Sequence, residues 1–124
     1  MSSSYCVDLL RTRSFGRLSL SVNALPVIEP VYFSMVDDSV VIQTHRGSWL
    51  ATSTDNAVVA LEVGELDPAT GWGWTVLVQG LAIDASARTL ARLDDISLPA
   101  DWLHPVALQH FEISTDRISG RHLS

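Results

Sequence analysis

The sequence predicts a mainly β protein, an antiparallel barrel or sandwich of about six strands with one or two short helices. Its apolar segments are short and many alternate with polar residues, which is typical of half-buried strands. Short turns join these segments, and strands do not alternate with long helices as they do around a parallel sheet. The length of 124 residues suits a single domain, residues 1–124, with one core.

The N-terminal part begins with a helix and two strands. Residues 4–11 predict a short helix, for which a serine is available as N-cap. The segment RLSLSVN after Gly16 alternates apolar and polar residues, which indicates a half-buried strand. The turn NALP leads into a second strand over residues 27–36. Pro30 inside this strand implies a sheet edge or a bulge, because proline cannot donate to the strand ladder.

The middle of the chain continues with a hairpin, a helical turn and a buried strand. Two aspartates at 37–38 predict a tight hairpin into a strand over residues 39–44. A short helical turn is expected to begin at residues 47–48. Residues 57–63 are an apolar run rich in valine, which favours a strand that is buried on both faces.

The C-terminal part predicts two more strands and a helix. Residues 72–84 form one long predicted strand, in which Gly80 indicates a bulge or a close backbone approach. Residues 86–93 favour a helix with a serine cap. An irregular linker then precedes a last strand around residues 106–113, and the tail STDRISGRHLS carries no predicted element.

Composition excludes several classes of function. Fourteen acidic residues against eight arginines leave a net charge of −6, which would repel the phosphate backbone of a nucleic acid. The absence of lysine excludes Schiff-base chemistry. No apolar run approaches the roughly 18 residues that span a bilayer, and no secretory signal is visible, so we expect a cytoplasmic protein without a membrane partner. The single Cys6 is expected to be a small buried hydrophobe, and the histidines lack the neighbours of a metal site.

The loop around residue 47 has the chemistry of an anion site. Thr44 and Ser48 offer hydroxyl groups, Gly47 allows a close backbone approach, and the start of a helix offers free amides. Arg46 could add a bidentate contact. The alternative is a polar surface turn with a helix cap, which the residue types alone favour.

Four phrases follow one another over about residues 9–121 of the chain. They are GRLSLSVNALPVIEPVYFSMVDDSVVIQTHRGSWLA, AVVALEV, GWGWTVLVQGLA and HFEISTDRISGR. In this order they resemble the short members of the pyridoxamine 5'-phosphate-oxidase-like family, the FMN-binding split barrels. The closing ISGR and the pattern WxVxVxG are the strongest pieces of this resemblance.

The resemblance implies a six-stranded antiparallel split β-barrel that forms a homodimer and holds FMN in a groove between the subunits. It implies that the flavin phosphate lies between the third strand and the next helix, that the ring lies along the second strand, and that the partner contributes near Trp74. The cofactor-binding residues are then expected to be Pro30, Val31, Tyr32, Gln43, Thr44, His45, Arg46, Gly47, Ser48, Trp49 and Trp74.

One position departs from the family pattern and leaves three hypotheses open. Trp49 stands where family members commonly carry a basic residue, and losing a charged contact to a phosphate costs on the order of 1.5–3 kcal/mol. In the first hypothesis Arg46 compensates for the lost charged contact, and the protein is a flavin-dependent oxidoreductase whose substrate and catalytic residue are unknown. A deazaflavin-binding reductase of the same fold is the second hypothesis. In the third, Trp49 fills the phosphate pocket, and the protein is a degenerate barrel that dimerises without flavin and is not an enzyme.

Overall fold

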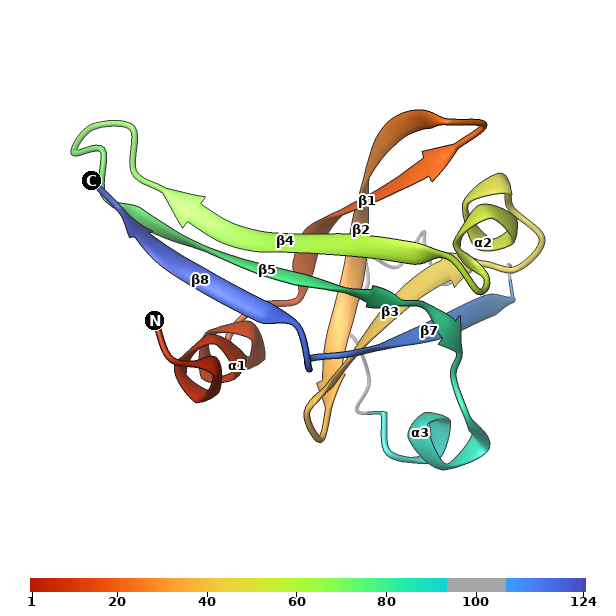
Figure 1. The fold of residues 1–124 in the computed structure, drawn as a ribbon. Helices are drawn as coiled ribbons and strands as arrows, with labels where there is room; N and C mark the ends of the chain where they lie inside the picture. Colours follow the sequence, from red (N-terminus) through yellow and green to blue (C-terminus); the bar gives the residue numbers. More distant parts are fainter. Residues whose placement is uncertain (94–106) are drawn as a thin grey trace.

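One curled, eight-stranded antiparallel sheet forms the body of the molecule in the computed structural model, which describes residues 1–93 and 107–124 (Figure 1). The strands lie in the order β6-β7-β3-β2-β1-β4-β5-β8. The sheet curls enough for β5 to contact β7, although the two are not neighbours in this order. The elements are α1 Ser3–Arg11, β1 Phe15–Val22, β2 Leu25–Val36, β3 Ser39–His45, α2 Trp49–Thr54, β4 Val58–Leu66, β5 Gly73–Leu81, β6 Ile83–Asp84, α3 Ala87–Ala91, β7 Leu108–Ser114 and β8 Ile118–Leu123.

The mainly β, antiparallel split-barrel prediction is confirmed, and the described residues form two strands and one helix more than the expected number. The strand β8 lies in the tail, where the sequence predicted no element. It pairs with β5 alone at one edge of the sheet, and its side chains are at most half-buried. The short β6 arises because the predicted strand 72–84 is interrupted at Ala82, whose amide donates to the carbonyl of Ala57 at 2.8 Å.

Two-residue turns close the first two hairpins; the second was predicted as a tight turn, whereas the first is shorter than the predicted turn NALP, because Leu25 and Pro26 already belong to β2. Val22 pairs with Leu25 around Asn23 and Ala24, both of which have positive φ angles of 52° and 66°. The β2–β3 turn is equally short, since its flanking residues Val36 and Ser39 are paired. Such tight turns fix the register of each strand against the next.

Pro30 lies where one side of β2 is open. It pairs with Arg17 on β1, whereas the pairing of β2 with β3 begins only at Phe33. The missing amide of Pro30 therefore costs no ladder bond on the β3 side, and the prediction of an edge position is confirmed.

The predictions for β4 and β5 need correction. Residues 57–63 are not buried on both faces, because Val59, Leu61 and Val63 point into the core while Val58 is 75% exposed. An antiparallel sheet with one solvated face explains this alternation. Of the two alternatives predicted for Gly80, the bulge is absent, because the register with Val59 runs through it without interruption, while β7 lies close, with Ile113 at 3.4 Å from the position of a Cβ.

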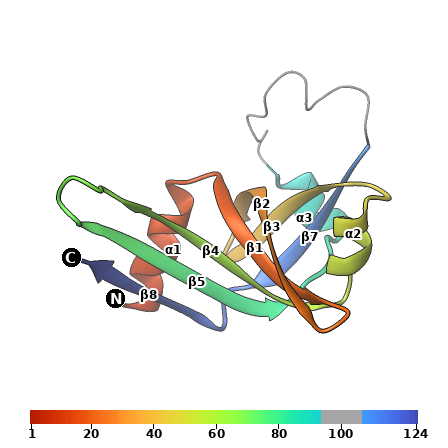
Figure 2. The same ribbon diagram turned by 90° about the horizontal axis from the view of Figure 1, so that it is seen from above.

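The helices cover the ends of the sheet. Figures 1 and 2 show α1 at the end of the molecule where both termini lie, and α2 at the opposite end. Cys6 and Leu10 of α1 are fully buried in the core, which confirms the prediction for Cys6. Serines cap the three helices of the described residues, and the caps of α2 and α3 are the predicted Ser48 and Ser86. None of the helices within the described ranges is both long and apolar enough to cross a bilayer.

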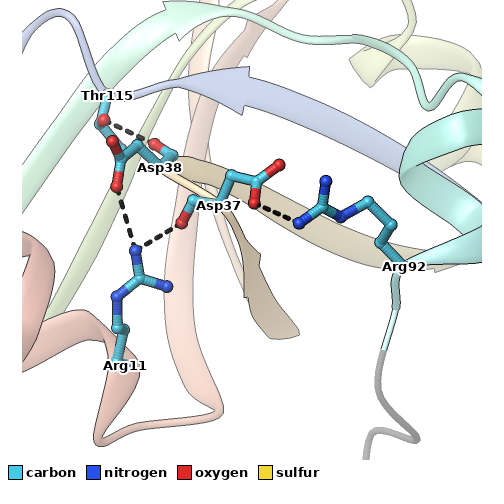
Figure 3. A network of polar contacts seen from close by, with 5 residues as sticks. All are labelled: Arg11, Asp37, Asp38, Arg92 and Thr115. Atoms are coloured by element: carbon cyan, nitrogen blue, oxygen red, sulfur yellow. Dashed lines mark hydrogen bonds and ion pairs between the residues drawn. The ribbon is translucent and has the colours of Figure 1, made fainter.

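A polar network ties the β2–β3 turn to three other segments (Figure 3). Arg11 donates to the Asp37 carbonyl at 2.6 Å and to the Asp38 carboxylate at 3.0 Å. Arg92, next to α3, donates to the Asp37 carboxylate at 2.7 Å, and the Thr115 hydroxyl donates to the Asp38 carbonyl at 2.6 Å. The turn is thereby joined to α1, to the end of α3 and to the segment between β7 and β8.

Candidate functional site

An open groove of about 180 Å³ lies where β2 and β3 separate, beside α2. The two strands are paired from their turn as far as Phe33 and Ile42, and their residues beyond this pair line the groove. The lining residues are Glu29, Pro30, Val31, Tyr32, Gln43, Thr44, His45, Ser48, Trp49, Leu50 and Leu108. Residues from β2, β3, α2 and β7 therefore meet in one open hollow.

The groove brings together eight of the eleven residues that the sequence suggested for a cofactor. They are Pro30, Val31, Tyr32, Gln43, Thr44, His45, Ser48 and Trp49. The other three, Arg46, Gly47 and Trp74, are not among its lining residues. Glu29 and Leu50 were missed although each is next to a predicted residue. Leu108 carries no local signal, because only its pairing with His45 across β3 and β7 brings it to the groove.

Thr44 holds the base of the groove to β7. Its side chain is buried, and its hydroxyl donates to the carbonyl of Gln109 at 2.8 Å. A threonine hydroxyl has one proton, so in this arrangement it offers a ligand only acceptor lone pairs. A phosphate needs donors, and Thr44 in this conformation therefore supports the site rather than donating to an anion.

Ser48 and Gly47 shape the turn into α2. The Ser48 hydroxyl oxygen accepts a hydrogen bond from the amide of Ala51 at 3.1 Å, which caps the helix and leaves its own proton for a second partner. Gly47 has a φ angle of 78°, and no atom lies within 4 Å of the position that a Cβ would take. Glycine is therefore required there by the backbone conformation and not by crowding.

Arg46 points along the β7 side of the loop. Its guanidinium donates to the Leu108 carbonyl at 3.3 Å, and its backbone amide donates to the Ala107 carbonyl at 2.9 Å. Burial, and secondly the charge of Arg46, lower the pKa of His110 from its ordinary value of 6.5. Among the described residues that line the groove, Glu29 is the acidic one, and none is an arginine.

Gln43 lines the groove and also holds an unsatisfied polar atom. It lies opposite His110 in the pairing of β3 with β7, and its side-chain Oε1 is buried without a hydrogen-bond partner among the described residues. A buried acceptor without a donor costs about 1–3 kcal/mol. A ligand with an N–H or O–H group would remove that cost if the side chain turned this oxygen toward the groove.

The remaining surface of the groove is apolar and aromatic. Val31, Leu50 and Leu108 contribute aliphatic surface, and Tyr32 stands edge-to-face with Phe15 at 5.7 Å between ring centroids. Trp49 is 52% exposed at the start of α2. A concave apolar surface with a few polar atoms is the usual character of a site for a planar organic molecule.

Trp74 lies away from the groove, against the hydrophobic core. The guanidinium of Arg13 stacks on its indole at 5.4 Å, and Arg13 also pairs with Glu65 at 2.8 Å. The expected contribution of Trp74 to the groove of a partner subunit stays a prediction. Trp72 is 69% exposed and precedes β5.

His104 and the predicted linker lie outside the described residues. Within the described residues, no group of histidine, cysteine and carboxylate side chains could hold a metal ion.

The chain matches known proteins over most of its length. Residues 2–122 fit the model of the family described as pyridoxamine 5'-phosphate oxidase. The uncharacterized protein Rv0080 of Mycobacterium tuberculosis is 35% identical over 83 residues, which are 63% of this chain and 55% of that protein. The chain thus spans about half the length of this relative.

Solved structures of similar fold include two described as flavin proteins. The FAD-binding protein from Mycobacterium smegmatis has a TM-score of 0.78 and 24% identity, over 99% of this chain and 96% of that one. An FAD-binding protein from Mesorhizobium loti has a TM-score of 0.75 and 21% identity, over 100% and 96%. A protein of unknown function from Corynebacterium diphtheriae has a TM-score of 0.76 and 26% identity, over 100% and 96%. These likenesses show that the fold is shared.

Proposed function

Since the chain belongs to the pyridoxamine 5'-phosphate oxidase family, we propose that it binds a flavin in the groove between β2, β3 and α2 and acts as a flavin-dependent oxidoreductase. The observation that carries the proposal is the position of the groove. It lies at the separation of β2 and β3 that the family resemblance indicates for the cofactor, and most of the residues expected there line it. Two structural neighbours described as FAD-binding proteins support the flavin class.

The ring of a flavin fits the chemistry of the β2 side of the groove. The isoalloxazine ring is planar and apolar on its faces, with N–H and C=O groups on one edge. Val31 and Tyr32 would border its face, and the unsatisfied Oε1 of Gln43 would accept from its edge. The flavin would supply the transfer of electrons or hydride, while these residues would orient it and exclude water.

The phosphate of the flavin would lie beside the turn into α2. The Ser48 hydroxyl retains a proton that can be donated to an anion. Arg46 could also reach this region if it gave up its bond to the Leu108 carbonyl, which is long at 3.3 Å and lies at the exposed surface. Thr44 is less suited to the phosphate, because its proton is already donated to Gln109.

A homodimer is part of the proposal, because the solvent side of the sheet carries exposed apolar residues next to the groove. Ile28 pairs with Ser19, and Val58 pairs with Leu81, which places these side chains on one face of β1, β2, β4 and β5. Ile28, Val58 and Leu81 are exposed in the single chain. This face continues along β2 to Tyr32, so a second copy seated on it would border the groove.

Flavin binding has a direct test. Purified protein should be yellow with flavin absorbance bands, or its melting temperature should rise when FMN, FAD or a deazaflavin is added in excess. Gln43→Leu should weaken flavin binding by about tenfold, since one hydrogen bond is lost. Thermal melting of the Gln43→Leu variant without flavin is the control, since it shows whether the variant is folded. Colourless protein that none of the three flavins stabilises would contradict the proposal and favour the barrel without flavin.

The dimer has a separate test, which is light scattering at micromolar concentration. A mass of two chains is expected, and Val58→Glu should lower it to that of one chain by placing a charge on the exposed apolar face. A wild-type protein that is monomeric under these conditions would contradict a groove shared by two subunits.

A further inference from the structure

Glu29 brings an acidic side chain to the groove from a strand position whose neighbours belong to the core. Side chains two residues apart in a strand point to the same face, so Glu29 shares its face of β2 with Val27 and Val31. Val31 is buried in the core, and Val27 packs against it. In the pairing with β1, Glu29 lies opposite Leu18, which is fully buried. The carboxylate therefore occupies a position that suits an apolar side chain.

No arginine of the chain pairs with the Glu29 carboxylate. All eight arginines lie among the described residues, no lysine is present, and the carboxylates that do form ion pairs with arginine are Asp37, Asp38, Glu62 and Glu65. Arg46, beside the groove residue His45, donates instead to the Leu108 carbonyl at 3.3 Å. The Glu29 carboxylate also accepts no hydrogen bond from a described residue. Such a half-buried charge is unfavourable, and a cationic group on a ligand would offset its cost.

The other walls of the groove suit a planar ligand that carries such a group. Pro30, Leu50 and Leu108 supply aliphatic surface, and Tyr32 and Trp49 supply aromatic rings. Aromatic faces attract cations as well as planar rings. A phosphate ester on the same ligand would instead lie near an acidic side chain in a groove that no arginine lines. The charge of the groove therefore favours a cationic ligand over an anionic one.

We propose that the substrate of this groove is a planar molecule with a cationic nitrogen group and no phosphate, and that Glu29 binds the cationic group. The inference rests on the proposed function, because this molecule would be the second reactant beside the flavin. A protonated amine or an amidinium would donate a charge-assisted hydrogen bond to the Glu29 carboxylate. Glu29 would then select substrates by charge, since the same carboxylate repels an anion.

The experiment compares three probes of the same planar shape, which are benzamidine as the cation, benzamide as the neutral molecule and benzoate as the anion. Their Kd is measured by NMR titration of the full chain, with and without a saturating flavin. Glu29→Gln removes the charge and keeps the shape of the side chain. Glu65→Gln is the matched control, because Glu65 is an exposed glutamate of β4 outside the groove. Thermal melting checks that both variants are folded.

Wild-type protein is expected to bind benzamidine about tenfold more tightly than benzamide, because a hydrogen bond to a charged group is gained. Benzoate should bind more weakly than either. Glu29→Gln should lower the affinity for benzamidine to that for benzamide, and Glu65→Gln should leave the three affinities unchanged. The backbone amides that shift on addition of benzamidine should lie in β2 around Glu29.

Three results would overturn the inference. The first is equal affinity of wild-type protein for the three probes, or no binding of benzamidine, and it needs no variant. The second is benzamidine binding that Glu29→Gln leaves unchanged, and the third is a set of shifted amides that lies away from β2. Failure of every flavin to bind would contradict the proposed function alone, because charge selection that depends on Glu29 would still be measured in the flavin-free protein.

Discussion

The hydroxyl of Thr44 donates a hydrogen bond to the carbonyl of Gln109 at 2.8 Å, and this bond joins the end of β3 to β7 beneath the groove. The two residues are 65 positions apart in the chain. Thr44 is one of two buried polar residues in the described part of the protein, so its loss is expected to affect stability before it affects binding.

Thr44→Val should lower the free energy of unfolding by about 1–3 kcal/mol, because the valine keeps the shape and removes the donor to a buried carbonyl. Urea denaturation measures this loss. Thr44→Ser, which keeps the hydroxyl, should cost less. Unchanged stability combined with a large loss of flavin affinity would show that Thr44 contacts the ligand directly.

Gly47→Ala should destabilise the protein by about 1–2 kcal/mol, because a φ angle of 78° is unfavourable for residues with a Cβ. The space around the Cβ position is open, so no steric term is expected in addition. Gly47→Asn should cost less than alanine, since asparagine tolerates the left-handed region better. A much larger loss for alanine would indicate crowding that the open geometry excludes. Thermal or urea unfolding distinguishes these outcomes.

Arg46→Gln should raise the pKa of His110 toward 6.5, because it removes the cation that opposes protonation of the imidazole. The pKa should remain below 6.5, since burial is the larger cause of the shift. NMR titration of the His110 ring measures both effects. A pKa that does not move would mean that Arg46 is turned away from His110 in solution.

His110 should also make the protein less stable as the pH falls below about 6.5. The folded-state pKa is lowered, so the unfolded chain takes up the proton first as the pH falls through 6.5. The loss of stability is complete once His110 is protonated in the folded protein as well. Above pH 6.5 the imidazole of His110 does not affect the stability. His110→Gln should flatten this part of the stability profile, which urea unfolding at a series of pH values records.

Asp37→Val should destabilise the protein much more than Arg92→Ala. The Asp37–Arg92 ion pair is solvent-exposed, with side-chain exposures of 61% and 48%, so its loss should cost less than about 1 kcal/mol. Valine at residue 37 loses that pair and also has to adopt a φ angle of 53°, which is unfavourable for a β-branched side chain. Asp37→Asn separates the two effects, because it removes the charge and tolerates the angle. Equal losses for Asp37→Val and Arg92→Ala would contradict this explanation.

Much of the fold could be predicted because its signals are local. Alternating side chains identified β1 and β3, the turn signals at residues 23–26 and 37–38 marked two hairpins, and serines marked the starts of α2 and α3. The strand β8 was missed because its own residues carry only a weak local signal. It is a short edge strand with weak alternation, and its partner β5 supplies the order that its own residues do not encode.

The sequence by itself determined the periods, turns and caps of this protein, and with them a polar loop that begins α2 and the β2 segment that faces it. Only the tertiary structure decided what these segments meet. The pairing of β3 with β7 brought Leu108 to the groove, directed Arg46 to the Leu108 carbonyl and engaged the Thr44 hydroxyl with Gln109. Hydrogen-bonding preferences within a few residues are set by local chemistry, whereas contacts between segments more than 60 positions apart depend on packing of the whole sheet.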